Sequence, residues 1–146
     1  MPTQRELDEV ELRHQVAEIA EGLQAKDPER LKKLYAADIV SFDIEPPLQC
    51  VGVEAKLKNW SPVFTHFEHV TFDIRELTIT AGDEVAFGHA FARLSGTLKD
   101  GSVMSGTWVR ATYCFRKIDG TWLIVHDQAS VPLDARSGRG IVDLEP

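Results

Sequence analysis

The sequence predicts an α+β domain in which N-terminal helices pack on the concave face of a long, curved, antiparallel sheet. Apolar residues recur at helical spacing in the first part of the chain, but mostly at every second position after residue 67. Asp-Gly and Gly-Asp turn signals separate the later strands. Helices and strands that are segregated along the chain are typical of the α+β class.

Two helices are expected at the start of the chain. Thr3 and Glu6 have the spacing of a capping box, and apolar residues at helical spacing continue the first helix to about Lys26. Asp27 suits the cap of a second helix, and Pro28 suits its first position.

A short strand and a third helix are expected next. The strand covers Asp38 to Ile44 and stops before Pro46-Pro47, which cannot donate to a strand ladder. An apolar stripe within residues 52–67 predicts the helix, and Pro62 within it predicts a kink or break near Ser61.

Four antiparallel strands complete the predicted domain. The alternation changes phase near Arg75-Glu76, which predicts a bulge there. Asp119-Gly120 predicts a tight hairpin between the last two strands. We assign residues 1–132 to a single domain and residues 133–146 to a C-terminal tail, expected to be a surface strap or a partner contact.

Composition limits the possible functions. The 146 residues are 43% hydrophobic and 27% charged, which is typical of a globular protein. The net charge of -7 argues against a nucleic-acid partner, because phosphate binding requires a basic surface. Neither a membrane-spanning run nor a signal-peptide pattern is present, so we expect a cytoplasmic protein without a membrane partner. Cys50 and Cys114 are expected to be free thiols.

Three segments resemble the nuclear transport factor 2-like (NTF2-like) superfamily, and within it the SnoaL-like and ketosteroid-isomerase-like proteins. They are Leu34 to Asp43, the helix start Gly52 to Ala55, and Phe115 to His126 with its Asp-Gly-x-Trp turn. The resemblance implies a cone-shaped, cystatin-like fold with a pocket inside the cone. The superfamily contains isomerases, cyclases, hydrolases, dehydratases and non-catalytic domains, so function has to be argued from the site itself.

The resemblance also implies catalytic roles. In isomerases of this type, a carboxylate matched here by Asp43 moves a proton beside a carbonyl, while a tyrosine and a neutral aspartic acid stabilise the enolate oxygen. Tyr113 stands at the neutral-acid position and can donate through its phenol. Ile19 stands at the tyrosine position and cannot donate.

Strand alternation, anchored on Tyr113, predicts which residues face the pocket. On the last strand it places Leu123 inside, and Trp122 and Ile124 outside. The expected catalytic residues are Asp43, Tyr113, His89 and Asp127, and the expected ligand-binding residues are Arg93, Phe87, Phe91, Trp60, Phe64, Val109 and Val125. An apolar wall with a few polar groups is the usual construction of a small-molecule site.

The polar candidates also have structural alternatives. Asp43 could cap the turn at Pro46-Pro47, His89 could be a core histidine, and Arg93 and Asp127 could form a buried ion pair. Tyr113 could be a core ring whose hydroxyl has one partner. No metal is expected, because His126 has no second histidine at alternate spacing and a helix-to-strand junction does not hold His66 and His69 on one face. No cofactor is expected either.

The outer face of the sheet is expected to be aromatic, with Trp108, Trp122 and His126 on it. Such patches commonly mark a partner surface. The resemblance implies sheet-to-sheet pairing, so we expect a homodimer through this outer face.

These observations support three candidate functions. The first is a cofactor-free isomerase-like or cyclase-like enzyme in which Asp43 moves a proton alpha to a carbonyl of a small apolar ligand, while Tyr113, with His89 or Asp127, stabilises the enolate. The second is a non-catalytic module in which Arg93 binds a small carboxylate-bearing molecule. The third is an assembly domain whose vestigial pocket is filled by side chains.

Overall fold

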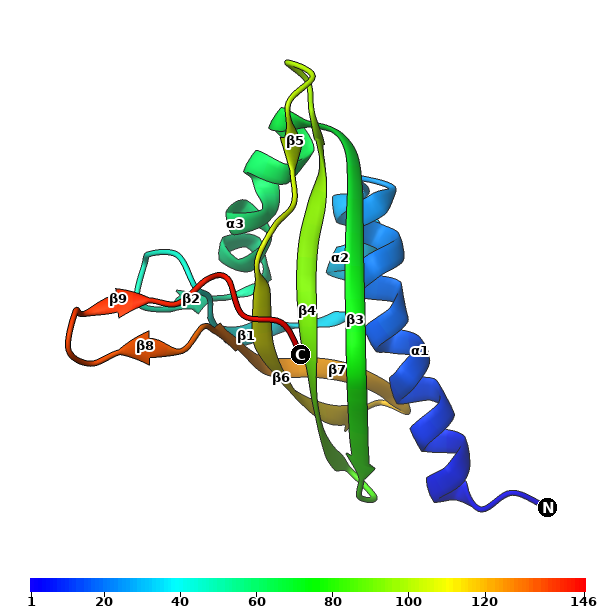
Figure 1. The fold of residues 1–146 in the computed structure, drawn as a ribbon. Helices are drawn as coiled ribbons and strands as arrows, with labels where there is room; N and C mark the ends of the chain where they lie inside the picture. The colour runs from blue at the N-terminus through cyan, green and yellow to red at the C-terminus, as the bar shows by residue number, and fades with distance from the viewer.

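Three helices lie beside a long curved sheet (Figure 1): α1 (Gln4–Gln24), α2 (Pro28–Lys32) and α3 (Val53–His66). The computed structural model describes residues 1–146. Thr3 Oγ1 accepts from the Glu6 amide at 3.1 Å, and the Glu6 carboxylate accepts from the Thr3 amide at 3.1 Å, which confirms the capping box. Asp27 caps α2 by accepting from the Arg30 amide.

The third helix runs through its proline without a break. Because Pro62 has no amide hydrogen, it cannot donate to the carbonyl of Lys58, four residues earlier. The Ser61 hydroxyl donates to that carbonyl instead, at 2.7 Å. The helix continues to His66, so of the predicted kink or break near Ser61 the break does not occur, and the kink stays a prediction.

The main sheet has the strand order β2-β1-β7-β6-β4-β3, and β5 pairs with β4. The strands are β1 (Tyr35–Phe42), β2 (Cys50–Val51), β3 (Phe67–Ala81), β4 (Val85–Leu98), β5 (Val103–Met104), β6 (Trp108–Ile118) and β7 (Thr121–Ser130). The four long strands are antiparallel, as predicted. However, β1 pairs with β7 in parallel, so the curved sheet is mixed.

Two local features of the sheet confirm sequence predictions. The pairing of β3 with β4 shifts register between Arg75 and Thr78, where Glu76 has a φ of 56°. Asp119 and Gly120 have φ values of 50° and 81° and connect β6 to β7, which fits the left-handed two-residue turn of a tight hairpin.

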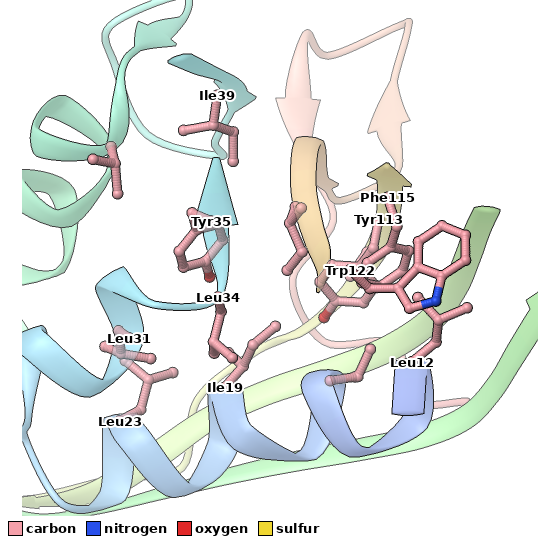
Figure 2. Close-up of a cluster of buried hydrophobic side chains, with 14 of the residues drawn as sticks. Leu12, Ile19, Leu23, Leu31, Leu34, Tyr35, Ile39, Tyr113, Phe115 and Trp122 are labelled. Atoms are coloured by element: carbon pink, nitrogen blue, oxygen red, sulfur yellow. The ribbon is translucent and has the colours of Figure 1, made fainter. Parts of the chain in front are cut away.

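The main core lies between α1, α2 and the concave face of the sheet (Figure 2). Trp122 and Ile124 are fully buried in it, so their predicted outward orientation is wrong. The reason is a bulge in β7: Cys114 pairs with His126, but Phe115 pairs with Ile124. Val125 is the extra residue, and it reverses the alternation of the residues before it.

The predicted tail forms a separate hairpin of β8 (Leu133–Asp134) and β9 (Arg139–Gly140). This hairpin extends away from the main sheet (Figure 1). Its role as a strap or partner contact stays a prediction. None of the helices combines the length and the apolar character that crossing a membrane demands.

Candidate functional site

A cavity of about 600 Å³ opens between α3 and the concave face of the sheet. Twenty-six residues line it, and 16 of these are hydrophobic. Trp60 and Val63 contribute from α3, while Val109, Ala111 and Tyr113 contribute from β6. The volume and the apolar wall fall within the ordinary range of small-molecule sites.

The strand register shows which β4 residues share the cavity face with β6. Residues that pair directly across antiparallel strands share a face. Ala92 of β4 pairs with Val109 of β6, and both line the cavity. The small side chain of Ala92 leaves space beside Val109. Val109 and Tyr113 line the cavity, which agrees with their predicted orientation.

The same register places four predicted site residues on the opposite face of the sheet. Their partners are outward-facing residues of β6: Phe87 pairs with Cys114, His89 with Thr112, Phe91 with Arg110, and Arg93 with Trp108. None of the four lines the cavity, so their expected orientation is wrong. The prediction assigned Phe87, His89, Phe91 and Arg93 to the inside, whereas the β4 residues that line the cavity are Ala92, Leu94 and Leu98.

Two further predicted ligand-binding residues lie outside the cavity. Phe64 packs against the hydrophobic core instead. Val125 is the extra residue of the β7 bulge and does not line the cavity either. Trp60 does line it, as predicted.

Arg93 and Asp127 do not pair with each other. Arg93 Nη2 lies 3.3 Å from Asp73 Oδ2, and its guanidinium stacks 4.7 Å from the centroid of the Trp108 ring. Asp127 belongs to a different cluster, inside the cavity. The alternative of an Arg93–Asp127 ion pair is therefore wrong.

The cluster around Asp127 is the main polar feature of the cavity wall. Lys56 Nζ lies 2.9 Å from Asp127 Oδ2 and donates to Ser41 Oγ at 3.2 Å. The Ser41 hydroxyl donates to Asp127 Oδ1. Lys56 and Asp127 are each 6% exposed and Ser41 is 1% exposed. A charged pair with this degree of burial is held together by mutual attraction that bulk water screens little.

Lys56 and Ser41 were not predicted as site residues, although each leaves a signal in the sequence. Lys56 lies three residues after Val53 and four before Trp60, so it is a charge on the apolar stripe of the helix. Ser41 alternates with Ile39 and Asp43 on one face of the first strand. A polar residue at an apolar position usually requires a buried partner.

Two tyrosines accompany this cluster in the cavity wall. Burial raises the pKa of the Tyr35 phenol well above its ordinary value, with smaller contributions from Asp127 and Asp43. Burial also raises the pKa of Tyr113, with smaller contributions from Tyr35 and Asp127. Both phenols are therefore neutral hydrogen-bond donors near pH 7.

Asp43 lies just after β1 and is half-buried in the lining of the cavity. Its Oδ1 accepts from the amide of Ile44 at 2.9 Å, so the local hydrogen bond goes to the next residue rather than to Pro46-Pro47. No group of three or more His, Cys, Asp or Glu residues is arranged to hold a metal ion. Cys50 and Cys114 are free thiols.

Solved structures define the class of this fold. An NTF2-like protein of unknown function from Pseudomonas putida KT2440 superposes with a TM-score of 0.84 at 26% identity, covering 96% of this chain and 97% of its own. A candidate scytalone dehydratase from Novosphingobium aromaticivorans DSM 12444 gives 0.78 at 14% identity, with coverages of 95% and 96%. A candidate dehydratase of the NTF2-like family from Streptomyces avermitilis gives 0.76 at 17% identity, with coverages of 90% and 100%. The fold is NTF2-like.

A sequence comparison narrows the class to one family. The model of the SnoaL-like domain family matches residues 12–134, which is most of the chain. The protein therefore belongs to the SnoaL-like domain family. No curated protein matches this chain.

Proposed function

We propose that this protein is a cofactor-free enzyme that moves a proton alpha to a carbonyl group of a small apolar ligand. One observation carries the proposal: Asp43, Tyr113 and the Lys56–Asp127 pair all line the same, mainly hydrophobic cavity. A base and several hydrogen-bond donors around an apolar chamber are the groups that enolate formation requires.

Asp43 is the proposed base. Its Oδ1 accepts a hydrogen bond from the Ile44 amide, while no protein donor reaches Oδ2, which leaves that oxygen for a substrate proton. Asp127 is less suited to this role, because Lys56 and Ser41 already engage its two oxygens. Asp127 instead positions the Lys56 ammonium.

The proposed donors to the enolate oxygen are the phenols of Tyr113 and Tyr35 and the ammonium of Lys56. The raised pKa values of both phenols keep them protonated near pH 7. An ammonium has three N–H donors, and the protein supplies two acceptors to Lys56, Asp127 and Ser41. His89 has no part in this arrangement, because it lies on the other face of the sheet.

The structure of the substrate decides the outcome of proton abstraction. A ligand without a leaving group is reprotonated elsewhere, which is an isomerisation. A ligand with a beta-hydroxyl group loses water instead. Two structural neighbours bear the name of candidate dehydratases, which supports including beta-hydroxy ketones among the substrates tested.

The two other functions have less support. A carboxylate-binding module requires a cation in the cavity, and Arg93 cannot serve as that cation because it lies outside the cavity. Lys56 is no substitute, because Asp127 already neutralises it. An assembly domain with a vestigial pocket predicts a filled chamber, whereas about 600 Å³ is open.

The enzyme is also proposed to be a cytoplasmic homodimer that pairs through the outer face of its sheet. On this face Val85 and Phe87 are 59% and 49% exposed. Apolar side chains gathered on one face favour a partner surface. Sedimentation at tens of micromolar should give twice the mass of one chain. A stable monomer would contradict the dimer.

Proton exchange tests the proposed function without knowledge of the natural substrate. Apolar cyclic ketones are incubated with the protein in deuterated water, and incorporation of deuterium at the alpha carbon is measured by mass spectrometry. Loss of a general base typically lowers the rate by about 10² to 10⁴-fold, so Asp43→Asn should lose most of the exchange.

The matched control is Asp38→Asn, which makes the same chemical change at an exposed position of β1, the strand that Asp43 follows. This variant should keep the wild-type rate. Equal exchange rates in the two variants would refute the role of Asp43.

A further inference from the structure

We propose that Lys56 is a covalent carbonyl-capturing residue, which forms an iminium adduct with aldehydes and ketones that enter the cavity. This activity goes beyond the proposed proton transfer. It rests on that proposed function in one respect: both require a ligand with a carbonyl group. The proposal starts from the position of Lys56, a lysine that lines the cavity but is only 6% exposed.

The surroundings of Lys56 are those of a nucleophilic amine. Its Nζ lies 5.6 Å from the centroid of the Tyr35 ring and 5.6 Å from that of the Trp60 ring. The two aromatic rings flank the nitrogen, and the residue as a whole is only 6% exposed. Lysine nucleophiles are activated by removal from water and by a neighbouring base.

The neighbouring base is Asp127, whose Oδ2 lies 2.9 Å from Nζ. Proton transfer over this distance turns an ammonium–carboxylate pair into an amine and a carboxylic acid. Ser41 donates to the other oxygen of the carboxylate and holds it in place.

The chemistry balances within this group of residues. Asp127 accepts one proton from Lys56, and the lone pair released on Nζ forms a bond to the carbonyl carbon. The electron pair of the C=O bond moves to the oxygen, which takes the proton back from Asp127 to give a carbinolamine. A second proton from nitrogen, relayed by Asp127, lets the hydroxyl group leave as water. The products are an iminium ion on Lys56, one water molecule and an unchanged Asp127.

The wall of the cavity selects the carbonyl compounds that can react. Sixteen of its 26 lining residues are hydrophobic, and Asp127 already balances the charge of Lys56. Neutral aromatic or alicyclic aldehydes and ketones fit this environment, whereas sugars and keto acids do not. The tyrosine phenols can donate to the carbonyl oxygen as the carbon is attacked.

Reductive trapping tests the proposal. The full-length protein is incubated with 2-naphthaldehyde and sodium cyanoborohydride, which reduces an iminium to a stable secondary amine. Intact-mass measurement should show one naphthylmethyl group per chain, and peptide mapping should place it on Lys56. An excess of 2-naphthylmethanol, which has the same ring system but no carbonyl, should compete for the cavity and suppress the labelling.

Two variants form the matched comparison. Lys56→Arg keeps the positive charge but cannot form the adduct, so labelling should be lost. Lys58→Arg makes the same change at an exposed position on the same helix and should leave labelling intact. Circular dichroism shows whether Lys56→Arg is folded; if it is not, the peptide map of the wild-type protein decides alone.

The outcomes separate this proposal from the proposed function. Labelling spread evenly over surface lysines, or no labelling at all, would overturn the role of Lys56. Deuterium exchange that depends on Asp43 would still stand in that case. Conversely, a specific Lys56 adduct in a protein that catalyses no exchange would leave the capture activity and remove the proton transfer.

Discussion

Two buried carboxylates, Asp8 and Asp127, show how similar pairs serve different purposes. Asp8 is 4% exposed and lies 3.1 Å from Lys117 Nζ, while Asp127 is 6% exposed and lies 2.9 Å from Lys56 Nζ. Asp8 fastens α1 to the hairpin of β6 and β7, whereas Asp127 lines the cavity. The proposed chemistry requires the opening beside the pair rather than the pair itself.

The donors around the two carboxylates differ as well. Asp8 Oδ1 accepts from the indole of Trp122 and from the side-chain Nε2 of Gln4, both at 3.1 Å. The Trp122 hydrogen bond is the largest influence on Asp8 and, with Lys117 and Gln4, holds its pKa below the ordinary value despite burial. Asp127 instead has the small hydroxyl of Ser41 and the open cavity beside it.

The largest effect is expected from removing the lysine of the cavity pair. Lys56→Met leaves the Asp127 charge buried without a cation, which typically costs about 3 to 5 kcal/mol in the free energy of unfolding. Lys117→Met leaves Asp8 with its other donors and should cost about 1 kcal/mol. Urea denaturation of both variants measures the difference. Equal losses would show that the two pairs are equivalent.

A double variant sharpens this test. Lys56→Met with Asp127→Leu removes both charges, and replacing a buried pair by apolar residues is often neutral. The double variant should recover most of the stability lost in Lys56→Met. If it is less stable than the single variant, the unpaired charge is not the cause of the loss.

Removal of Asp8 should destabilise the fold without affecting the cavity. Asp8→Ala leaves the buried indole N–H of Trp122 without an acceptor, at a cost of about 2 to 3 kcal/mol. Asp83→Ala is the control, because that side chain is 97% exposed. Thermal unfolding measures the stabilities. Reductive labelling of Lys56, counted per folded molecule, should be the same in both variants. A loss of labelling in Asp8→Ala alone would show that the two sites are coupled.

The pH dependence of stability should identify Asp8. A carboxylate whose folded pKa lies below its unfolded value stabilises the fold fully above the unfolded pKa, and this contribution is lost as the pH falls through the folded pKa. The ordinary value is 3.8. The stability difference between the wild-type protein and Asp8→Ala should therefore shrink as the pH falls from about 5 into the acid range, as measured by urea denaturation. A difference that grows would contradict the lowered pKa of Asp8.

A less buried pair should have the smallest effect. Arg30 makes two contacts of 2.8 Å with the Glu18 carboxylate, but the two side chains are 38% and 21% exposed. Solvent screening limits such pairs to about 0.5 to 1 kcal/mol, so Glu18→Gln should lose less stability than Asp8→Ala. A larger loss would mean that contact geometry outweighs burial in this protein.

The sequence was sufficient to predict the fold because its signals are local. The capping box at Thr3, the turn at Asp119-Gly120 and the bulge at Glu76 each depend on a few neighbouring residues, and all three are present. The parallel pairing of β1 with β7 joins residues far apart in the chain, such as Ser41 and Asp127, and no local pattern specifies it.

The site was only partly predictable, for a different reason. Strand alternation correctly placed Tyr113 and Val109 on the cavity side of β6. On β7, however, the single extra residue Val125 reverses the orientation of the residues before it, so Trp122 and Ile124 are buried instead of facing outward. On β4 the cavity is lined by Ala92, Leu94 and Leu98, which lie on the face opposite to Phe91 and Arg93. Lys56 was overlooked because its partner Asp127 is contributed by a distant strand.

Deuterium exchange at the alpha carbon of apolar ketones, measured per folded molecule in three asparagine variants, tests the central claim most directly. Exchange should be nearly abolished in Asp43→Asn, reduced in Asp127→Asn, and unchanged in Asp8→Asn. A wild-type rate in Asp43→Asn, or an equal loss in Asp8→Asn, would show that the cavity is not where the proton is transferred.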